Sequence, residues 1–177
     1  MTHTLRSTAL AALLALGLAS PAHADLAEGA RAPVFTTKAA MAGKEFGFSL
    51  ATALKQGPVV LYFYPKAFTS GCTLEANAFA EAMPQFKGAG ASVIGMSNDD
   101  IETLKRFSRE ECRDAFPVGV ASLDLMQDYE VGGPDSPYAS RTSYVIAPNG
   151  TITTVYTSGD YREHVSRTLA AVKNLSK

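Results

Sequence analysis

The amino-acid sequence predicts an α/β fold, with a mixed central β-sheet flanked by helices on both faces. Segments rich in β-branched and aromatic residues alternate with amphipathic segments of helical period. The segment VVLYFY, residues 59–64, is apolar almost throughout, which is typical of a central strand covered on both sides. Near the end of the chain, a short turn joins two strand-like segments, which adds an antiparallel hairpin to the sheet.

The first 24 residues have the composition of a cleaved secretory signal peptide. Arg6 gives a positive start, the apolar run ALAALLALGLA follows, and Ala22 and Ala24 are small residues that fit a cleavage site. This run is shorter than the roughly 20 residues that a membrane-spanning helix needs. We therefore expect a cleaved signal peptide over residues 1–24, a single domain over residues 25–177, and a periplasmic or secreted protein with no membrane segment after processing.

Six strands are expected in the mature chain. Each is rich in residues that favour extended backbone, and they lie near residues 33–37, 59–64, 92–97, 117–121, 143–147 and 152–156. The last two are joined by the sequence PNGT, in which Asn149 and Gly150 suit the positive φ angles of a tight hairpin turn.

Helical patterns lie between and after these strands. Residues 99–113 carry an apolar face, and Asp99 with Glu102 has the spacing of a capping box. Residues 160–175 repeat the pattern, with Asp160 and Glu163 at the start. The apolar faces consist of Ile101, Leu104 and Phe107 in the first helix and Val165, Leu169 and Val172 in the second. This order of strands and helices fits the thioredoxin-type α/β sandwich.

Composition excludes several classes of function. The sequence has 16 basic and 17 acidic residues, and removal of the leader with Arg6 makes it slightly more acidic, so neither nucleic acid nor an anionic membrane is an expected partner. Two cysteines and three histidines, two of them in the leader, are too few for a typical zinc site, and we expect no metal. The remaining histidine, His164, is interpreted as a polar residue at the edge of the last helix.

One cysteine has a distinctive position. Cys72 follows the apolar strand at the start of a predicted helix, where free backbone N–H groups and the helix dipole favour an anionic thiolate. Thr69 lies three residues earlier and can point its hydroxyl into the same pocket, and Pro65 can end the strand while removing a backbone donor. A further cation would complete an anion site.

The segment YFYPKAFTSGCTLEA resembles the active-site signature of peroxiredoxins, the AhpC/TSA superfamily, and in particular its bacterioferritin-comigratory or Q-type branch. The later segment RTSYVIAPNGTI resembles the part of that family in which an arginine precedes a strand and hairpin. The resemblance extends over essentially the whole mature chain. It implies a thioredoxin-like fold and an active-site set of Pro65, Thr69, Cys72 and Arg141.

In that family a cysteine thiolate reduces hydrogen peroxide or an organic hydroperoxide and becomes a sulfenic acid. The resemblance gives this role to Cys72, with Arg141 stabilising the thiolate and the departing oxygen and Thr69 aligning the peroxide. It implies no metal or organic cofactor. The expected partners are the peroxide and a thioredoxin-like or small-thiol reductant in the periplasm. Glu75, on the first turn of the helix, can be catalytic or can simply suit the helix dipole.

The sequence departs from the family where a second cysteine is concerned. Many members carry a resolving cysteine five residues after the peroxidatic one, and here that position is Asn77. The remaining candidate is Cys112, at the end of the helix expected over residues 101–111, as resolver or as bystander to an external thiol. We expect the two cysteines to lie further apart than the roughly 5.5 Å Cα separation of a disulfide, so pairing requires a helix end to unwind.

Two other classes of function stay open at this level. A thiol-disulfide oxidoreductase shares the expected fold, but a Cys-x-x-Cys motif would need a cysteine at Thr69. A non-catalytic binding domain on the same fold predicts an unreactive Cys72. The sequence leaves open the preferred peroxide, the reductant and the oligomeric state, for which the branch resemblance favours a monomer or weak homodimer.

Overall fold

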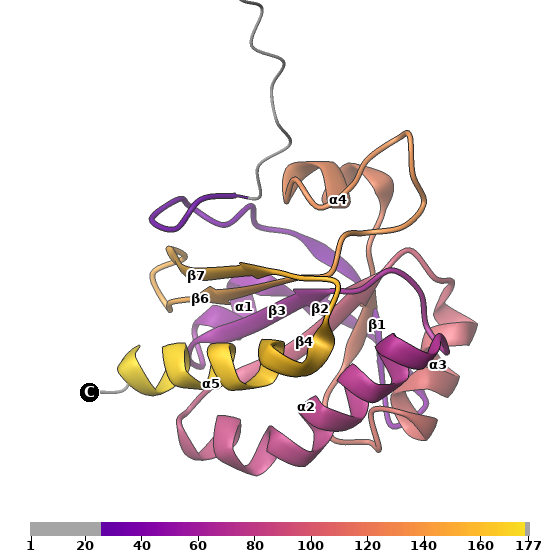
Figure 1. Ribbon diagram of the computed structural model, residues 1–177, viewed down its shortest axis with the longest axis horizontal. Helices are drawn as coiled ribbons and strands as arrows, with labels where there is room; N and C mark the ends of the chain where they lie inside the picture. Colours follow the sequence, from indigo (N-terminus) through magenta and orange to yellow (C-terminus); the bar gives the residue numbers. More distant parts are fainter. Residues whose placement is uncertain (1–25, 176–177) are drawn as a thin grey trace, which may run out of the picture.

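A computed structural model describes residues 26–175, and its centre is a seven-stranded sheet in the order β2-β1-β5-β4-β3-β6-β7 (Figure 1). The strands are β1 (Thr36–Met41), β2 (Lys44–Ser49), β3 (Val59–Phe63), β4 (Ser92–Ser97), β5 (Val118–Val120), β6 (Thr142–Ile146) and β7 (Ile152–Thr157). The helices are α1 (Leu50–Leu54), α2 (Ser70–Gly88), α3 (Ile101–Glu110), α4 (Leu123–Asp128), the 3₁₀ turn η1 (Tyr161–Glu163) and α5 (His164–Leu175). The leader expected over residues 1–24 lies outside the described residues.

The sheet is mixed, as predicted. Strand β3 pairs in parallel with β4 and antiparallel with β6, and β4 pairs in parallel with β5. The hairpin β6–β7 forms one edge of the sheet. The hairpin β1–β2 forms the other edge, where β1 pairs antiparallel with β5. All five residues of β3 are buried, which confirms the central strand expected from its apolar sequence.

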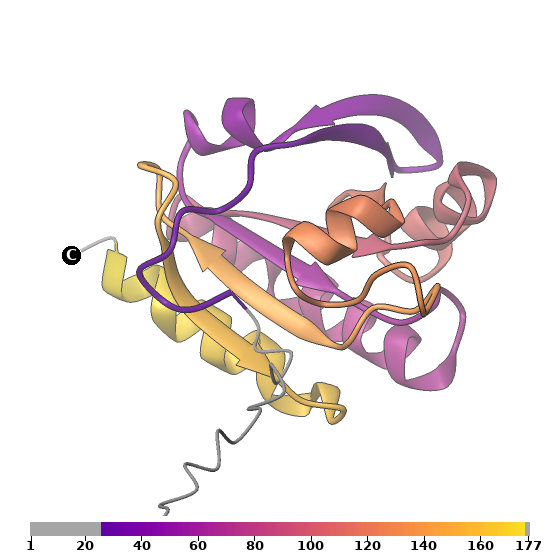
Figure 2. The same cartoon turned by 90° about the horizontal axis from the view of Figure 1, so that it is seen from above.

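Helices cover both faces of the sheet, because alternate residues of β3 enter two different cores (Figures 1 and 2). Val60 and Tyr62 pack with apolar residues of α2, α3 and α5. Val59 and Leu61 pack on the other face with residues of α1 and α4. Both faces are therefore buried, as the sequence of the strand predicts.

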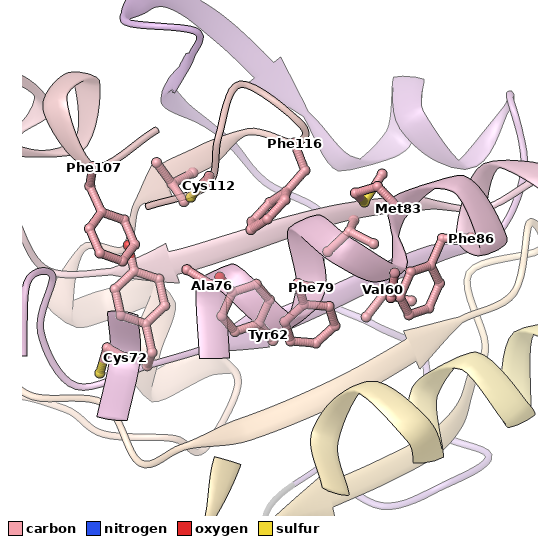
Figure 3. Packing of buried hydrophobic residues seen from close by; sticks show 14 of the residues in the cluster. Val60, Tyr62, Cys72, Ala76, Phe79, Met83, Phe86, Phe107, Cys112 and Phe116 are labelled. Carbon is pink, nitrogen blue, oxygen red and sulfur yellow. The ribbon is translucent and has the colours of Figure 1, made fainter. Parts of the chain in front are cut away.

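The long helix α2 carries Cys72 close to its start. Phe79, Met83 and Phe86 recur at helical spacing and pack into the same core cluster as Cys72 (Figure 3). Pro84 lies inside this helix, on its exposed side, and has no N–H to donate to the preceding turn. Packing of the buried face outweighs that local cost.

Two local predictions need correction. The turn after β6 has a positive φ at Gly150 (83°) but not at Asn149, and the register shifts next to it, so the loop is longer than a two-residue hairpin turn.

Helix α3 is capped by Asp100, whose side chain accepts from the Thr103 N–H, rather than by Asp99. The Asp99 carboxylate instead accepts from the Ala67 N–H and the Ser97 hydroxyl. A tertiary contact has therefore replaced the expected cap.

The sequence pattern missed four short elements: β1 beyond its first two residues, β2, α1 and α4. Strand β2 is an edge strand, largely exposed, so it has no alternation of buried and exposed residues. The helices α1 and α4 are too short to show a helical period. Within residues 26–175, no helix has both the length and the apolar character needed to cross a membrane.

Candidate active site

The thiol of Cys72 lies in the first turn of α2 and is almost closed to water. Thr69 is the N-cap residue, the Cys72 side chain is 2 % exposed, and both cysteines of the described chain are free thiols. The position gives the sulfur the positive end of a 19-residue helix. The sequence predicts this placement, and the structure confirms it.

Arg141 supplies the cation that the sequence analysis expects. It lies next to Thr142, which pairs with Phe63 at the end of β3, and the chain reaches α2 a few residues after β3. Its Nη2 donates to Cys72 Sγ at 3.4 Å. A Cβ atom at Gly71 would lie 3.2 Å from the same Nη2, so glycine leaves room for this contact. The register of β6 against β3 thus brings Arg141 close to Cys72, although the two residues are far apart in the sequence.

Glu75 is the second buried partner of Arg141. It lies one turn after Cys72, is fully buried, and accepts a hydrogen bond through Oε2 from Arg141 Nη1. Burial raises the pKa of Glu75 to about 8, against the opposing effect of Arg141. Its Oε1 has no hydrogen-bond partner among the residues that the structure describes. Glu75 is therefore part of the site, which the sequence left open.

His164 is not the edge residue that the sequence predicts. Its side chain is fully buried, Nδ1 lies 2.8 Å from Ser143 Oγ and 3.8 Å from Glu75 Oε1, and Nε2 lies 3.1 Å from the Ser158 carbonyl oxygen. Burial lowers the pKa of His164, although the Ser158 contact opposes this. Because the first turn of α5 faces the sheet, His164 lies in the protein interior although it is at a helix start.

Pro65 and Thr69 flank the thiol on the loop between β3 and α2. Pro65 follows the strand as expected. Thr69 is exposed, and its hydroxyl donates to the Lys66 carbonyl at 2.9 Å. In this part of the chain the structure brings Arg141, rather than Thr69, into hydrogen-bond contact with Cys72, so the role of Thr69 toward a peroxide stays a prediction.

Cys112 lies just beyond α3, near its expected position, in the same core cluster as Phe107 and Phe116 (Figure 3). It is fully buried, and its N–H donates to the Phe107 carbonyl. Burial raises the pKa of the Cys112 thiol well above its usual range. In this state Cys112 is a protonated core residue.

A buried thiol at a helix N-terminus, with a guanidinium in contact, is a site for nucleophilic cysteine chemistry. On this mixed sheet it defines a cysteine-dependent enzyme of the α/β class. No group of three or more potential metal-ligating side chains occurs in residues 26–175.

Comparison with known proteins defines the class further. Residues 29–155 match the AhpC/TSA family. Chloroplastic peroxiredoxin Q of Suaeda salsa is 34 % identical over 156 residues, covering 86 % of this chain and 70 % of that protein. The structure of peroxidoxin BcpB from Mycobacterium tuberculosis has a TM-score of 0.75 at 27 % identity, covering 84 % of this chain and 97 % of that one. That of Xanthomonas campestris bacterioferritin comigratory protein has a TM-score of 0.69 at 26 % identity, covering 79 % and 92 %.

The chain therefore belongs to the AhpC/TSA family, in its peroxiredoxin Q or bacterioferritin-comigratory branch. It has the thioredoxin-like fold of its structural relatives and is a thiol-dependent peroxidase, an oxidoreductase that acts on peroxides with a thiol reductant. These findings confirm the fold and the class of activity expected from the resemblance.

Proposed function

We propose that Cys72 is the peroxidatic nucleophile and that Arg141 stabilises both its thiolate and the oxygen that leaves. The observation that carries this proposal is the 3.4 Å contact from Arg141 Nη2 to Cys72 Sγ in a site almost closed to water. A guanidinium keeps its charge at any working pH, and its second nitrogen is already fixed by Glu75. Arg141 is therefore pre-organised for charge that develops during the reaction.

The reaction is a displacement at oxygen. The Cys72 thiolate attacks the terminal oxygen of a hydroperoxide, an S–O bond forms, and the O–O bond breaks. Sulfur is oxidised to a sulfenate, while the other peroxide oxygen is reduced and leaves as water or an alcohol with the proton of the hydroperoxide; a proton from solvent then gives the sulfenic acid. A thiol then reduces the sulfenic acid to complete the cycle.

Thr69 and Pro65 complete the substrate site in this proposal. The Thr69 hydroxyl uses its hydrogen on the Lys66 carbonyl, so its lone pairs can accept the single O–H of a hydroperoxide. Pro65 offers no N–H that could compete for peroxide oxygen. The substrates we propose are hydrogen peroxide and organic hydroperoxides, and the Xanthomonas campestris relative, described by its alkyl peroxide reduction activity, supports the second.

We further propose that Cys112 resolves the sulfenic acid by forming a disulfide with Cys72. Both residues belong to one core cluster, but Cys112 is fully buried and its thiol is protonated. Resolution therefore requires the segment after α3 to open. Arg113 and Asp114, which follow directly, have φ angles of 50° and 57°, a costly conformation for side-chain-bearing residues that favours local opening.

The composition of residues 1–24 supports export, so we propose a periplasmic or secreted enzyme that is reduced by a thioredoxin-like protein or small thiol of that compartment. N-terminal sequencing of the protein from cells should begin at Asp25, and a Met1 start on the abundant species would oppose export.

We propose a monomer or weak homodimer, and a stable larger assembly in light scattering would contradict it.

Peroxide consumption with a thiol reductant tests the proposed nucleophile. Wild type should consume peroxide and Cys72→Ser should not, although both should show the same circular dichroism. Insulin reduction by wild type should stay at background, because Thr69 stands where a Cys-x-x-Cys motif for dithiol exchange would need a cysteine. Undiminished peroxide turnover by Cys72→Ser would refute the assignment.

A further inference from the structure

A line of contacts leads from the catalytic thiol into the interior behind it. Arg141 touches Cys72 through Nη2 and Glu75 through Nη1, and the other carboxylate oxygen of Glu75 faces His164. His164 in turn contacts Ser143 and the Ser158 backbone. Glu75, Ser143 and His164 are fully buried, and the peroxide chemistry described above uses neither Ser143 nor His164.

The hydrogen bond to Ser158 fixes which nitrogen of His164 carries hydrogen. A backbone carbonyl oxygen accepts only, so Nε2, 3.1 Å from the Ser158 oxygen, must be the donor. In the neutral ring, Nδ1 then has a lone pair. Ser143 Oγ, at 2.8 Å, donates its hydrogen to this lone pair, and Glu75 Oε1 lies next to it at 3.8 Å, beyond hydrogen-bond distance. His164 is thus built to accept a proton or a hydrogen bond at Nδ1.

Glu75 has one carboxylate oxygen that lacks a hydrogen-bond partner among the described residues. Its Oε2 accepts from Arg141, but Oε1 is buried without a partner among the described residues, which is a costly state for a carboxylate oxygen. A hydrogen on Oε1 would turn that unpartnered acceptor into a donor directed at Nδ1. To donate to Nδ1, Oε1 has to move from 3.8 Å to hydrogen-bond distance, and the Ser143 hydroxyl has to turn its hydrogen away from the same lone pair.

We propose that His164 is a positioning residue for peroxide reduction: its Nδ1 accepts a hydrogen bond from protonated Glu75, and this leaves the full charge of Arg141 to the catalytic thiolate. The proposal rests on the assignment of Cys72 as nucleophile. An ionised Glu75 would neutralise Arg141, whereas a protonated one would hold the guanidinium without competing for its charge. Burial supports this distribution, since it raises the pKa of Glu75 and lowers that of His164, both in favour of neutral forms.

Other charged and titratable groups surround the pair, and each acts from a different element. Arg141 before β6 opposes protonation of both members, Asp160 before α5 favours a charged His164, and Arg167 on α5 opposes it. The remaining neighbours are the Tyr62 hydroxyl of β3, the Cys72 thiol of α2 and the Tyr156 ring of β7, which lies edge-on to the imidazole. The variants proposed for the test below leave all of these neighbouring residues unchanged.

The test measures ionisation of Cys72 without turnover, so its outcome is separate from that of the peroxide assay. In a Cys112→Ser background, the rate of Cys72 alkylation by iodoacetamide is followed by intact mass across the acidic and neutral pH range. His164→Gln keeps a donor for Ser158 but replaces the basic ring nitrogen Nδ1 by a much weaker amide-oxygen acceptor. We expect the midpoint of the thiolate profile to rise by about one pH unit, a roughly tenfold loss of thiolate on the acidic side.

Two comparisons separate the proposed role from packing. Ser143→Ala, the matched control, removes the other Nδ1 contact and should not raise the midpoint. In a Glu75→Gln background, where position 75 cannot ionise, His164→Gln should have no further effect, because His164 acts only through Glu75.

Three results would overturn the proposal. They are an unchanged midpoint in His164→Gln, an equal shift in the Glu75→Gln background, and a rise with Ser143→Ala. Should His164→Gln fail to fold, Glu75→Gln alone decides: a midpoint at or below wild type supports a neutral Glu75, and a rise of a full unit contradicts it.

Discussion

At the residue scale, the proposed nucleophile Cys72 lies against a buried cation, Arg141. The Arg141 side chain is 8 % exposed and contacts both Cys72 and the fully buried Glu75. Burial acts to lower the pKa of Arg141, but Glu75 and Cys72 outweigh it, so the pKa is raised overall and the charge is retained. The planar guanidinium reaches two partners at once, which a lysine ammonium on a flexible stem does not reproduce.

We therefore predict that Arg141→Lys slows peroxide reduction by at least about tenfold, or roughly 1.4 kcal/mol in the barrier. Stopped-flow measurement of the oxidation step gives the rate constant. The matched control is Arg106→Lys, an exposed arginine paired with Glu110 on α3 that should leave the rate unchanged. An Arg141→Lys rate equal to wild type would show that a positive charge alone suffices.

A second prediction concerns the pH dependence of stability. Burial raises the pKa of Glu75 from 4.5 to about 8, so between these values the folded state retains a proton that the unfolded state has lost. The contribution of Glu75 to the free energy of unfolding is then fully present below about pH 4.5 and is lost as the pH rises through about 8, by up to about 1.4 kcal/mol per pH unit.

Glu75→Gln removes this titration. The unfolding free energy of wild type minus that of the variant should fall as the pH rises across this interval, measured by urea denaturation at several pH values. A difference that is constant or rises with pH would mean that Glu75 is ionised in the folded protein.

At the scale of elements, the site depends on where α2 begins and where α3 ends. Helix α2 is anchored by its buried face, and it holds Cys72 in place although Pro84 interrupts its backbone bonding. The segment after α3 holds Cys112 in the core through backbone bonds and two left-handed residues. Helix α2 is thus fixed by its packing, whereas the segment after α3 has local backbone strain.

Pro84 is exposed, so Pro84→Ala changes the helix backbone and little else. We predict that it raises the free energy of unfolding by about 1–3 kcal/mol, because it restores a helical N–H and removes the ring clash. Chemical denaturation measures the change, with the exposed neighbour Gln85→Ala as control. A destabilised Pro84→Ala protein would show that the core packing requires the bend.

The segment after α3 is tested through Cys112. If it opens and Cys112 resolves the sulfenic acid, peroxide-treated wild type should form a monomeric Cys72–Cys112 disulfide, seen as the loss of two hydrogen atoms and a linked peptide. Cys112→Ser should complete one turnover and then accumulate sulfinic acid. If wild type over-oxidises as readily as Cys112→Ser and yields no linked peptide, an external thiol is the resolver.

Over the whole molecule, the sequence predicts best where periodicity and burial agree. Strand β3 is apolar throughout and fully buried, so the central sheet and its flanking helices were predictable. The contact of Cys72 with Arg141 follows from the register of β3 with β6, which the sequence alone does not show, and the resemblance supplied that pair.

His164 was interpreted wrongly because the start of a helix is usually solvated, and only the packing of α5 against β6 reveals that this one is interior. Glu75 was undecided for a related reason, since an acidic residue in a first helical turn is expected with or without a partner. Contacts between distant elements place both residues, and local sequence patterns do not encode such contacts.

The most direct test of the account is the intact mass of reduced Cys112→Ser protein after one equivalent of peroxide. We predict the gain of a single oxygen atom on Cys72 as a sulfenic acid, trapped by a dimedone-type reagent, with no such gain in a protein that also carries Cys72→Ser. A Cys72 that stays unmodified while peroxide is consumed, or an oxygen gained elsewhere on the chain, would contradict it.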